Sequence, residues 1–154
     1  MKEIVLSQGK VALVDNDDFE YLNQWKWYAW CSRGHFYAVR SIYINGKKSN
    51  IHLHRLIMKT PIGMEVDHKD MNGLNCQKYN MRNCTHRQNM CNRKSTGSSK
   101  YLGVYFQKKY IRATITVNRK VIYLGIYKKE IDAAIAYNEA AIKYHGEFAN
   151  INVI

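Results

Sequence analysis

One part of the chain lacks the side chains from which a protein core is built. Residues 64–94 are poor in aliphatic residues and rich in Asn, Asp, His and Arg. The segments on either side carry apolar residues at the spacings of strands and of a helix. Because a segment of this composition buries little apolar surface, a functional site explains it better than a core does. The 154 residues are expected to form one domain or two to three very small ones.

The segment before it, 1–60, is expected to be rich in β-strands. Residues 11–14 form a short apolar run that ends in a cluster of turn residues. Asn45-Gly46 predicts a two-residue hairpin turn between strands at 37–44 and 49–56. A small core is expected from four aromatic residues, Trp25, Trp27, Tyr28 and Trp30.

The segment after it follows the periods of regular structure. Strict alternation of apolar and polar residues at 111–117 predicts a half-buried strand, and 101–106 and 121–127 are expected to be its neighbours. Residues 130–145 predict a helix that packs on this three-stranded antiparallel sheet. The apolar stripe expected to face the sheet consists of Ile131, Ala134, Ile135, Asn138, Ala141 and Ile142. The fold class is therefore α+β.

The formal charge of +12 is concentrated in one window of the chain. Residues 71–129 contain thirteen Lys and Arg residues and no acidic residue. A solvated face normally mixes the two signs, so a window of one sign indicates a polyanionic partner. Nucleic acid is the first candidate. An anionic membrane is the second, but it needs a basic amphipathic helix with a bulky apolar face, and these cations do not sit on one.

Targeting and redox signals point to the cytoplasm. No apolar run reaches the roughly 18 residues of a membrane span, and the N-terminus lacks the apolar core of a signal peptide. The cysteines lack the CxxC spacing of a zinc knuckle, so reduced thiols are expected. A zinc-stabilised module on Cys84, His86 and Cys91 stays an alternative.

Residues 67–92 predict a strand, a loop, a short strand and a helix. Val66-Asp67-His68 ends the first strand, and Asn80 opens the second, at 80–84. Thr85-His86-Arg87-Gln88 fits a capping box, which predicts a helix from Thr85 to about Arg93 with Asn89 in its second turn. This order brings carboxylate, imidazole and amide groups into one small unit.

These residue types suit the hydrolysis of a phosphodiester. An imidazole with a pKa near 6.5 can take a proton from water at neutral pH. A divalent metal can neutralise the phosphate, and Asp and Asn oxygens suit Mg²⁺. Asp67 and His68 are neighbours on an extended chain and point to opposite faces, so one can hold a metal while the other addresses water.

At these positions the chain resembles the HNH endonucleases, whose fold is the ββα-metal finger. The matching residues are Val66-Asp67-His68, Leu74-Asn75, Asn80-Met81-Arg82, Gln88-Asn89 and Asn92, closest to the homing-type subgroup. The resemblance implies that His68 is the general base and that Asp67 and Asn89 hold a single Mg²⁺. It implies that Asn80 orients the finger loop through hydrogen bonds to backbone. Cys76-Gln77 departs from the family, which commonly has an Asp-Asn pair and a basic residue there.

Three further histidines are weaker candidates. His52 and His54 are expected to alternate along a strand on one face, as structural or phosphate-facing residues or, less favoured, as metal ligands. His86 lies one residue past the helix cap and is a secondary candidate for contact with phosphate or metal.

Residues 99–152 resemble the DNA-binding domain of the APETALA2/ethylene-response-factor type. The match rests on Tyr101-Leu102-Gly103-Val104, Ala113-Thr114-Ile115, Tyr123-Leu124-Gly125-Ile126-Tyr127, Ala133-Ala134, Ala136-Tyr137-Asn138, Ala140-Ala141, Gly146, Ala149 and Asn152. In that family a three-stranded sheet lies in the major groove. Alternation predicts that the DNA-facing residues here are Tyr105, Gln107, Arg112, Thr114, Thr116, Arg119 and Tyr123. Lys109, at a strand end, is expected to contact phosphate. The plant family carries arginines and a tryptophan at several of these positions, so its target sequence does not transfer.

Together these features predict a metal-dependent DNA endonuclease of the homing type. The expected organisation is a β-rich part at 1–60, an HNH finger at 61–94, a linker at 95–100 and an APETALA2-type domain at 101–154. We expect one Mg²⁺ as cofactor, double-stranded DNA as partner, no membrane, no small-molecule substrate and a monomer. Genes of this build are common in bacteriophages, which predicts a phage source and a place in the host cytoplasm. The alternatives are a DNA-binding regulator with an inactive finger and a protein that binds or cleaves RNA.

Overall fold

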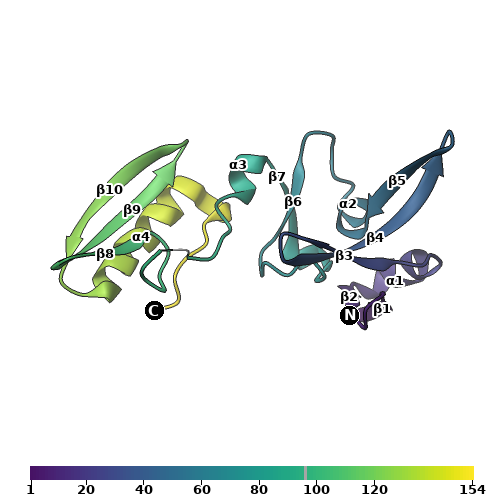
Figure 1. The fold of residues 1–154 in the computed structure, drawn as a ribbon, viewed down its shortest axis with the longest axis horizontal. Coiled ribbons are helices and arrows are strands. Elements are labelled where there is room, and N and C mark those ends of the chain that lie inside the picture. Colours follow the sequence, from purple (N-terminus) through teal and green to yellow (C-terminus); the bar gives the residue numbers. More distant parts are fainter. Residues whose placement is uncertain (96) are drawn as a thin grey trace. The chain divides into compact units, whose positions relative to one another are not determined.

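The chain folds as two compact units in the computed structural model, which describes residues 1–95 and 97–154. The first unit is Met1–His86 and the second is Arg87–Ile154. Both combine antiparallel sheets with helices, so the predicted α+β class is confirmed (Figure 1). Among the described residues, no helix has the length and apolar character needed to cross a membrane.

The first unit holds three small antiparallel sheets. The sheets are β1–β2, β3–β4–β5 and β6–β7. The elements are β1 (Lys2–Val5), β2 (Val11–Val14), α1 (Asn16–Asn23), β3 (Tyr28–Ser32), β4 (His35–Ile44), β5 (Lys47–His52), α2 (Leu53–Ile57), β6 (Glu65–His68), a 3-10 turn η1 (Lys78–Asn80) and β7 (Met81–Cys84). The helix α3 (His86–Asn89) begins at the last residue of this unit.

One core serves the whole first unit. Its buried side chains come from the β-rich part and from the finger, and include Ile4, Leu22, Trp27, Leu53, Cys76 and Met81. The Trp27 indole Nε1 donates to the Leu22 carbonyl at 2.9 Å, which satisfies the one polar atom of that ring. The β-rich part and the finger therefore share one core, and the change in composition at residue 61 is a change of side-chain type within one unit.

The loop of the finger is bonded to β2 as a short extra strand. The Leu13 N–H donates to the Leu74 carbonyl at 2.8 Å, and the Cys76 N–H donates to the Leu13 carbonyl at 2.8 Å. The Asp15 carboxylate accepts the Lys78 N–H at 2.8 Å. Through these bonds the N-terminal strands hold the loop that lies between the two finger strands.

The predicted hairpin at Asn45-Gly46 is confirmed. Ile44 pairs with Lys47 across a two-residue turn whose φ values are 50° at Asn45 and 75° at Gly46. The predicted continuation of the second strand to residue 56 is wrong, because β5 ends at His52 and α2 follows. Leu53 and Leu56 stand three apart and both face the core, which a helical turn permits and a strand does not.

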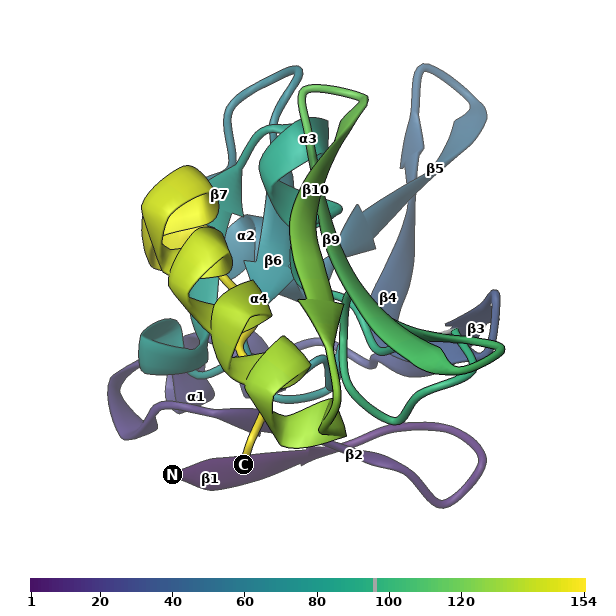
Figure 2. The same ribbon diagram turned by 90° about the vertical axis from the view of Figure 1, so that its left-hand side faces the viewer.

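The second unit is a three-stranded sheet covered by one helix. Its elements are β8 (Val104–Gln107), β9 (Tyr110–Val117), β10 (Lys120–Tyr127), α4 (Glu130–His145) and a 3-10 turn η2 (Gly146–Phe148). The antiparallel order is β10–β9–β8, and α4 runs along one side of this sheet (Figure 2). The predicted strands, the Asn118-Arg119 turn and the helix are confirmed.

The face of α4 that meets the sheet differs from the predicted stripe. The buried residues are Ala133, Ala134, Tyr137, Ala140 and Ala141, whereas Ile131, Ile135 and Ile142 are exposed. A Cβ added at Gly103 would lie 2.1 Å from the Tyr137 ring. The predicted stripe is right at Ala134 and Ala141 and wrong at its three isoleucines, because the helix meets the sheet closely through its alanines and Tyr137.

The serines at 95–100 are part of the second unit. The Ser95 hydroxyl donates to the Ser99 carbonyl at 2.8 Å, and the Ser99 hydroxyl donates to Glu130 Oε1 at 2.6 Å. The Phe106 N–H donates to Ser98 Oγ at 2.9 Å. Of the predicted linker, Thr96 lies outside the described residues, and these three serines tie the start of the unit to β8 and α4.

Candidate functional site

The finger strands place Asp67 and His68 on opposite faces of a two-stranded ribbon. In the antiparallel register of β6 and β7, Asp67 lies opposite Arg82 and His68 lies opposite Met81. The first strand ends at His68 as predicted, and the second begins at Met81, one residue after Asn80. Since neighbouring residues of a strand face opposite ways, each side chain enters a different environment.

Asp67 is buried against an arginine from the facing strand. Its side chain is 3% exposed, and Oδ2 accepts from Arg82 Nε at 2.7 Å and pairs with Nη2 at 2.6 Å. A buried carboxylate needs such a partner, because desolvation of an isolated charge is costly. Arg82 holds the carboxylate in one orientation. Sequence reasoning matched Arg82 to the family but missed this ion pair, which only the strand register reveals.

Asn80 ties together the two ends of the finger loop. Its Oδ1 accepts the Asp70 N–H at 3.1 Å, and its Nδ2 donates to Asp70 Oδ1 and to the Asn75 carbonyl, both at 2.9 Å. The residue is 2% exposed. Two of these three bonds, to the Asp70 N–H and the Asn75 carbonyl, are to backbone, the kind of bond that the family resemblance implies for Asn80.

Asp70 is the second member of this network, and sequence reasoning gave it no role in the loop. It accepts from the Asn72 N–H at 2.9 Å and from Asn75 Nδ2 at 2.8 Å. Burial alone would raise the pKa of Asp70, but the hydrogen bonds from Asn72, Asn75 and Asn80 outweigh it and lower that pKa. Asp70 is therefore a carboxylate that holds the loop closed.

His68 lies in a group of aromatic rings. Its ring centroid is 5.3 Å from that of His54, with the planes at 82°, and 6.3 Å from that of Tyr37. His68 is 6% exposed. Burial lowers its pKa, while the charges of Asp70 and Asp67 raise it in part. The imidazole is therefore neutral at neutral pH, the form that can accept a proton.

The expected placement of His52 and His54 side by side on a strand is wrong. His52 is the last residue of β5 and His54 lies in α2, yet their ring centroids are 5.3 Å apart. Burial, the neighbouring His68 and His52 rings and Arg55 lower the pKa of His54 to about 3. His54 is thus a neutral ring packed against His68.

Tyr37 closes this aromatic group from β4. Its ring centroid is 5.5 Å from that of His54. A Cβ added at Gly73 would lie 2.6 Å from the Tyr37 ring, so the finger loop rests directly on the ring. Burial, and to a lesser degree the charge of Glu65, raise the pKa of Tyr37. No local sequence signal links Tyr37 to His68, because they are distant along the chain.

The helix after the finger strands is shorter than predicted. It ends at Asn89 rather than near Arg93, and turns follow in which the Cys91 N–H donates to the Gln88 carbonyl and the Asn92 N–H donates to the Asn89 carbonyl. Asn89 belongs to the second unit and Asp67 to the first, so their joint metal site stays a prediction. Within residues 1–95 and 97–154, no three His, Cys, Asp or Glu side chains form a metal-binding group.

The residues of the zinc alternative have other contacts. His86 Nδ1 lies 2.8 Å from Glu65 Oε1 on the surface. Burial raises the pKa of the Cys84 thiol to about 11, and its Sγ donates to the Glu65 carbonyl at 3.6 Å. The Cys91 Sγ donates to the Arg87 carbonyl at 3.4 Å. Cys84 is therefore a packed thiol.

The sheet of the second unit presents one face away from α4. Tyr105 pairs with Arg112 and Thr114 with Tyr123, which places these four on that face. The predicted residues on the exposed part of this face or at its turns are Gln107, Lys109, Arg112, Thr116, Arg119 and Tyr123. Tyr105 is half-buried and Thr114 is only 9% exposed, because it lies in the central strand. Val121 and Ile126 are also exposed on this face, and of these two Ile126 was not predicted to lie there.

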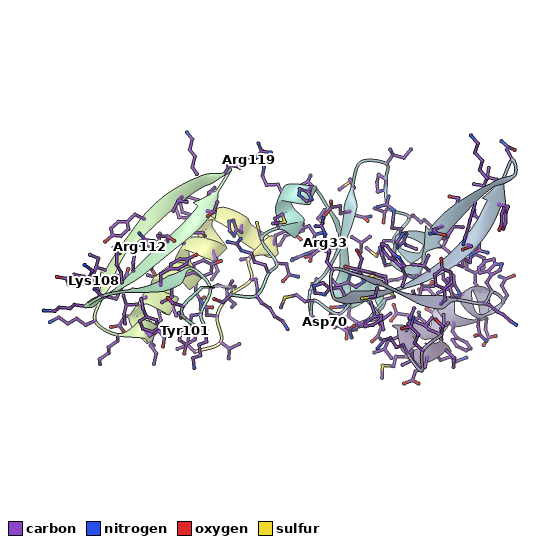
Figure 3. The ribbon with its side chains drawn as sticks, viewed as in Figure 1. Arg33, Asp70, Tyr101, Lys108, Arg112 and Arg119 are labelled. Atoms are coloured by element: carbon purple, nitrogen blue, oxygen red, sulfur yellow. The ribbon has the colours of Figure 1, made fainter. Side chains whose placement is uncertain are left out.

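Cations occupy both hairpin turns of this sheet. Lys108 and Lys109 connect β8 to β9, and Asn118 and Arg119 connect β9 to β10 (Figure 3). Lys108 has φ of 49° and Arg119 has φ of 65°, a left-handed conformation that favours glycine. On the face between them, the Arg112 guanidinium lies 5.7 Å from the Tyr105 ring centroid.

Comparison with known proteins identifies the family. The chain is 31% identical over 153 residues to an uncharacterized HNH endonuclease of Acanthamoeba polyphaga mimivirus, a match that covers 96% of this chain and 77% of the relative. No protein-family model matches the chain. With the finger geometry, this relationship shows that the chain belongs to the HNH endonuclease family. The resemblance of the second unit to the APETALA2 type gains no support and stays a prediction.

Proposed function

We propose that the protein is a metal-dependent endonuclease of the homing type that hydrolyses phosphodiester bonds in double-stranded DNA. The observation that carries this proposal is the arrangement at the end of β6. There a buried imidazole, His68, follows a buried carboxylate, Asp67, at the end of the strand that leads into the loop closed by Asn80. The relative of the same family is named as an endonuclease, which supports the same activity here.

In the proposed mechanism His68 is the general base. Its neutral ring takes a proton from water, the water oxygen forms a bond to phosphorus, and the bond from phosphorus to the leaving oxygen breaks. His54 and Tyr37 pack against the His68 ring and limit its rotation. Asn80 holds the loop and is a positioning residue.

Asp67 and Asn89 are the proposed holders of one Mg²⁺. A carboxylate and an amide oxygen are hard donors, which fit Mg²⁺ better than the thiol of Cys84 does. Arg82 fixes the Asp67 carboxylate through Oδ2, so this donor has one orientation. The metal would supply charge neutralisation at the scissile phosphate.

The second unit is the proposed DNA-binding module of the APETALA2 type. Its outer face carries Arg112, Thr116 and Tyr123 between two cationic turns. All three strands of the sheet lie within residues 71–129, a window without any acidic residue. Gln107 can pair with adenine, and the lysines of the turns can contact phosphates. Binding of DNA by this unit would raise the concentration of DNA near His68.

Plasmid nicking in Mg²⁺ tests the proposal. We expect the wild-type protein to convert supercoiled plasmid, and His68→Ala to lower the rate by about a hundredfold or more. His145→Ala, which changes a histidine at the end of α4, should leave the rate within about twofold. Chelation of divalent cations should stop cleavage by the wild type. Equal rates for wild type and His68→Ala would overturn the assignment of the base, and cleavage by neither protein would favour the regulator.

A further inference from the structure

The hairpin β4–β5 extends beyond the sheet to which it belongs. The strand β3 pairs with β4 only from His35 to Val39, whereas β5 pairs with β4 as far as Ile44. Residues 40–51 are therefore a two-stranded ribbon without a third strand, and it projects from the first unit in Figure 1. We call residues 40–51 the ribbon.

Stability of the fold does not explain the ribbon. Tyr43 is 74% exposed and Ile44 is 55% exposed, and every residue from Lys47 to Asn50 is exposed. A two-stranded hairpin alone is at best marginally stable in water, and apolar side chains at its tip gain nothing there. The exposed side chains are better explained by a partner.

The charge around the ribbon has one sign. Residues 21–64 contain no acidic residue and seven cations, Lys26, Arg33, Arg40, Lys47, Lys48, Arg55 and Lys59. Arg40 packs on the Trp25 ring, with 4.1 Å from its guanidinium carbon to the ring centroid, and Arg55 donates to the Met64 carbonyl at 2.7 Å. Lys47 and Lys48 are exposed on the ribbon, so this surface complements a polyanion.

A side-chain network fixes the polar residues at the base of the ribbon. Ser41 Oγ donates to Asn50 Oδ1 at 3.2 Å, and the Tyr28 hydroxyl donates to the same oxygen at 3.3 Å. Asn50 is therefore held by its oxygen. Its amide N–H₂ is the part that can donate to an acceptor on a base edge.

The face that carries Asn50 continues to His68. In register, Tyr28 pairs with Val39 and Val39 with His52, so these side chains share one face with Trp30 and Tyr37. The Trp30 and His52 ring centroids are 5.5 Å apart. His52 is 5.3 Å from His54, which packs on His68. One continuous face runs from the ribbon to the proposed general base.

Arg33 marks the end of the sheet nearest this base. It lies in the turn between β3 and β4, two residues before His35, and has φ of 50° (Figure 3). Asn or Gly adopts this conformation at lower cost than Arg, by roughly 1 kcal/mol. A cation in that position suits contact with a phosphate near the bond that is cut.

We propose that the ribbon enters a groove of the same duplex that the finger cuts. The major groove admits a two-stranded ribbon, and Lys47 and Lys48 would contact the phosphates that line it. Asn50 and Tyr43 would lie against base edges. The inference rests on the proposed function in one respect, which is that double-stranded DNA is the substrate. It assigns the first unit a DNA contact of its own, independent of the second unit.

The salt dependence of binding tests the ribbon. Binding to a duplex DNA fragment is measured from 50 to 200 mM salt for the full chain carrying His68→Ala, so that cleavage does not interfere. Adding Lys47→Gln and Lys48→Gln should lower the slope of log K against log salt by about 1.8, since each phosphate contact contributes about 0.9. The control, Lys2→Gln with Lys143→Gln, removes the same charge outside residues 21–64 and should leave the slope unchanged.

The measurements can overturn the proposed contact between the ribbon and DNA in several ways. An unchanged slope for the ribbon variant, or an equal fall for the control, would overturn the proposal. Asn50→Ala should shorten the footprint on DNA with little change in slope, and a footprint of unchanged length would also overturn it. A double-stranded RNA competitor as effective as DNA would show that the partner is RNA. Since cleavage plays no part here, failure of the nuclease assignment would leave these measurements valid.

Discussion

The two units treat polar side chains in opposite ways. The first unit buries Asp67, His68 and Asn80, and satisfies or encloses each of them with groups from other segments. The second unit fills the space between sheet and helix with apolar residues and keeps Arg112 and Tyr123 in water. Burial of polar groups is costly without partners, so the first arrangement suits a reaction site with fixed geometry. The second suits a surface that meets another molecule.

The comparison also shows where each unit is vulnerable. In the second unit the closest packing is at Gly103, below the Tyr137 ring. The first unit should be most sensitive to loss of the hydrogen-bond network around Asn80. Disruption of Gly103 should abolish binding of DNA by the sheet, whereas disruption of Asn80 should abolish reaction.

The largest effect is expected from Gly103→Ala. The new Cβ would lie 2.1 Å from the Tyr137 ring and 2.4 Å from the Thr114 carbonyl oxygen, at φ of 69°. Steric overlap and the left-handed backbone together should destabilise the second unit by about 4 kcal/mol. Thermal unfolding and DNA binding measure this. Gly146→Ala, with φ of 55°, ψ of −130° and no atom within 4 Å of the new Cβ, should cost less, about 1–3 kcal/mol from backbone strain alone. Equal stability of the two variants would contradict the close packing of α4.

Asn80→Ala should have the next largest effect, in the first unit. It leaves the part-buried Asp70 N–H and the buried Asn75 carbonyl without their partner, at a cost of about 3 kcal/mol. We expect the cleavage rate to fall by about a hundredfold while DNA affinity is unchanged. Asn23→Ala, at an exposed position, is the matched control. A parallel loss of affinity would mean that the loop binds DNA instead of supporting His68.

Mild acid should destabilise the first unit by a smaller amount. The pKa of His54 is about 3 in the folded state and about 6.5 when unfolded, so the unfolded state binds the proton first as pH falls. The stabilisation is complete above pH 6.5 and is lost progressively from pH 6.5 toward 3. Between pH 7 and 5 His54 alone should lower the free energy of unfolding by about 2 kcal/mol.

Thermal unfolding of His54→Phe at the two pH values isolates this residue. The variant should lose part of the pH dependence, and the remainder should come from His52 and His68, whose pKa values burial also lowers. The same pH dependence in the wild type and in His54→Phe would show that His54 is not the buried neutral ring that the structure contains.

Arg112→Gln should have the smallest effect. It removes one cation from the outer face of the second unit, so the salt slope of DNA binding should fall by about 0.9 and the affinity by about tenfold or less. Lys143→Gln, on α4 behind the sheet, removes the same charge and should change neither. If both variants behave alike, the outer face of this sheet has no special part in binding.

The two units also differed in how well the sequence predicted them. In the second unit, alternation at 111–117 predicted β9 and its neighbours, because the sheet is half-buried and its pattern is local. In the finger, the order of strand, loop and strand was predicted from the residues and a capping box, and the family resemblance supplied the residue roles, since 64–94 has little apolar pattern. The predicted stripe of α4 was right at Ala134 and Ala141 and wrong at its three isoleucines, because the helix meets the sheet through alanines and Tyr137.

The sequence by itself determined the fold class, the hairpin at Asn45-Gly46 and the family to which the finger belongs. It also placed Asp67 and His68 together at a strand end, since neighbours on a strand face opposite ways. Only the tertiary structure decided what surrounds them. Arg82 meets Asp67 through the register of two strands, and His54 and Tyr37 meet His68 from segments distant along the chain. Such contacts depend on the packing of a shared core, which no local sequence pattern predicts.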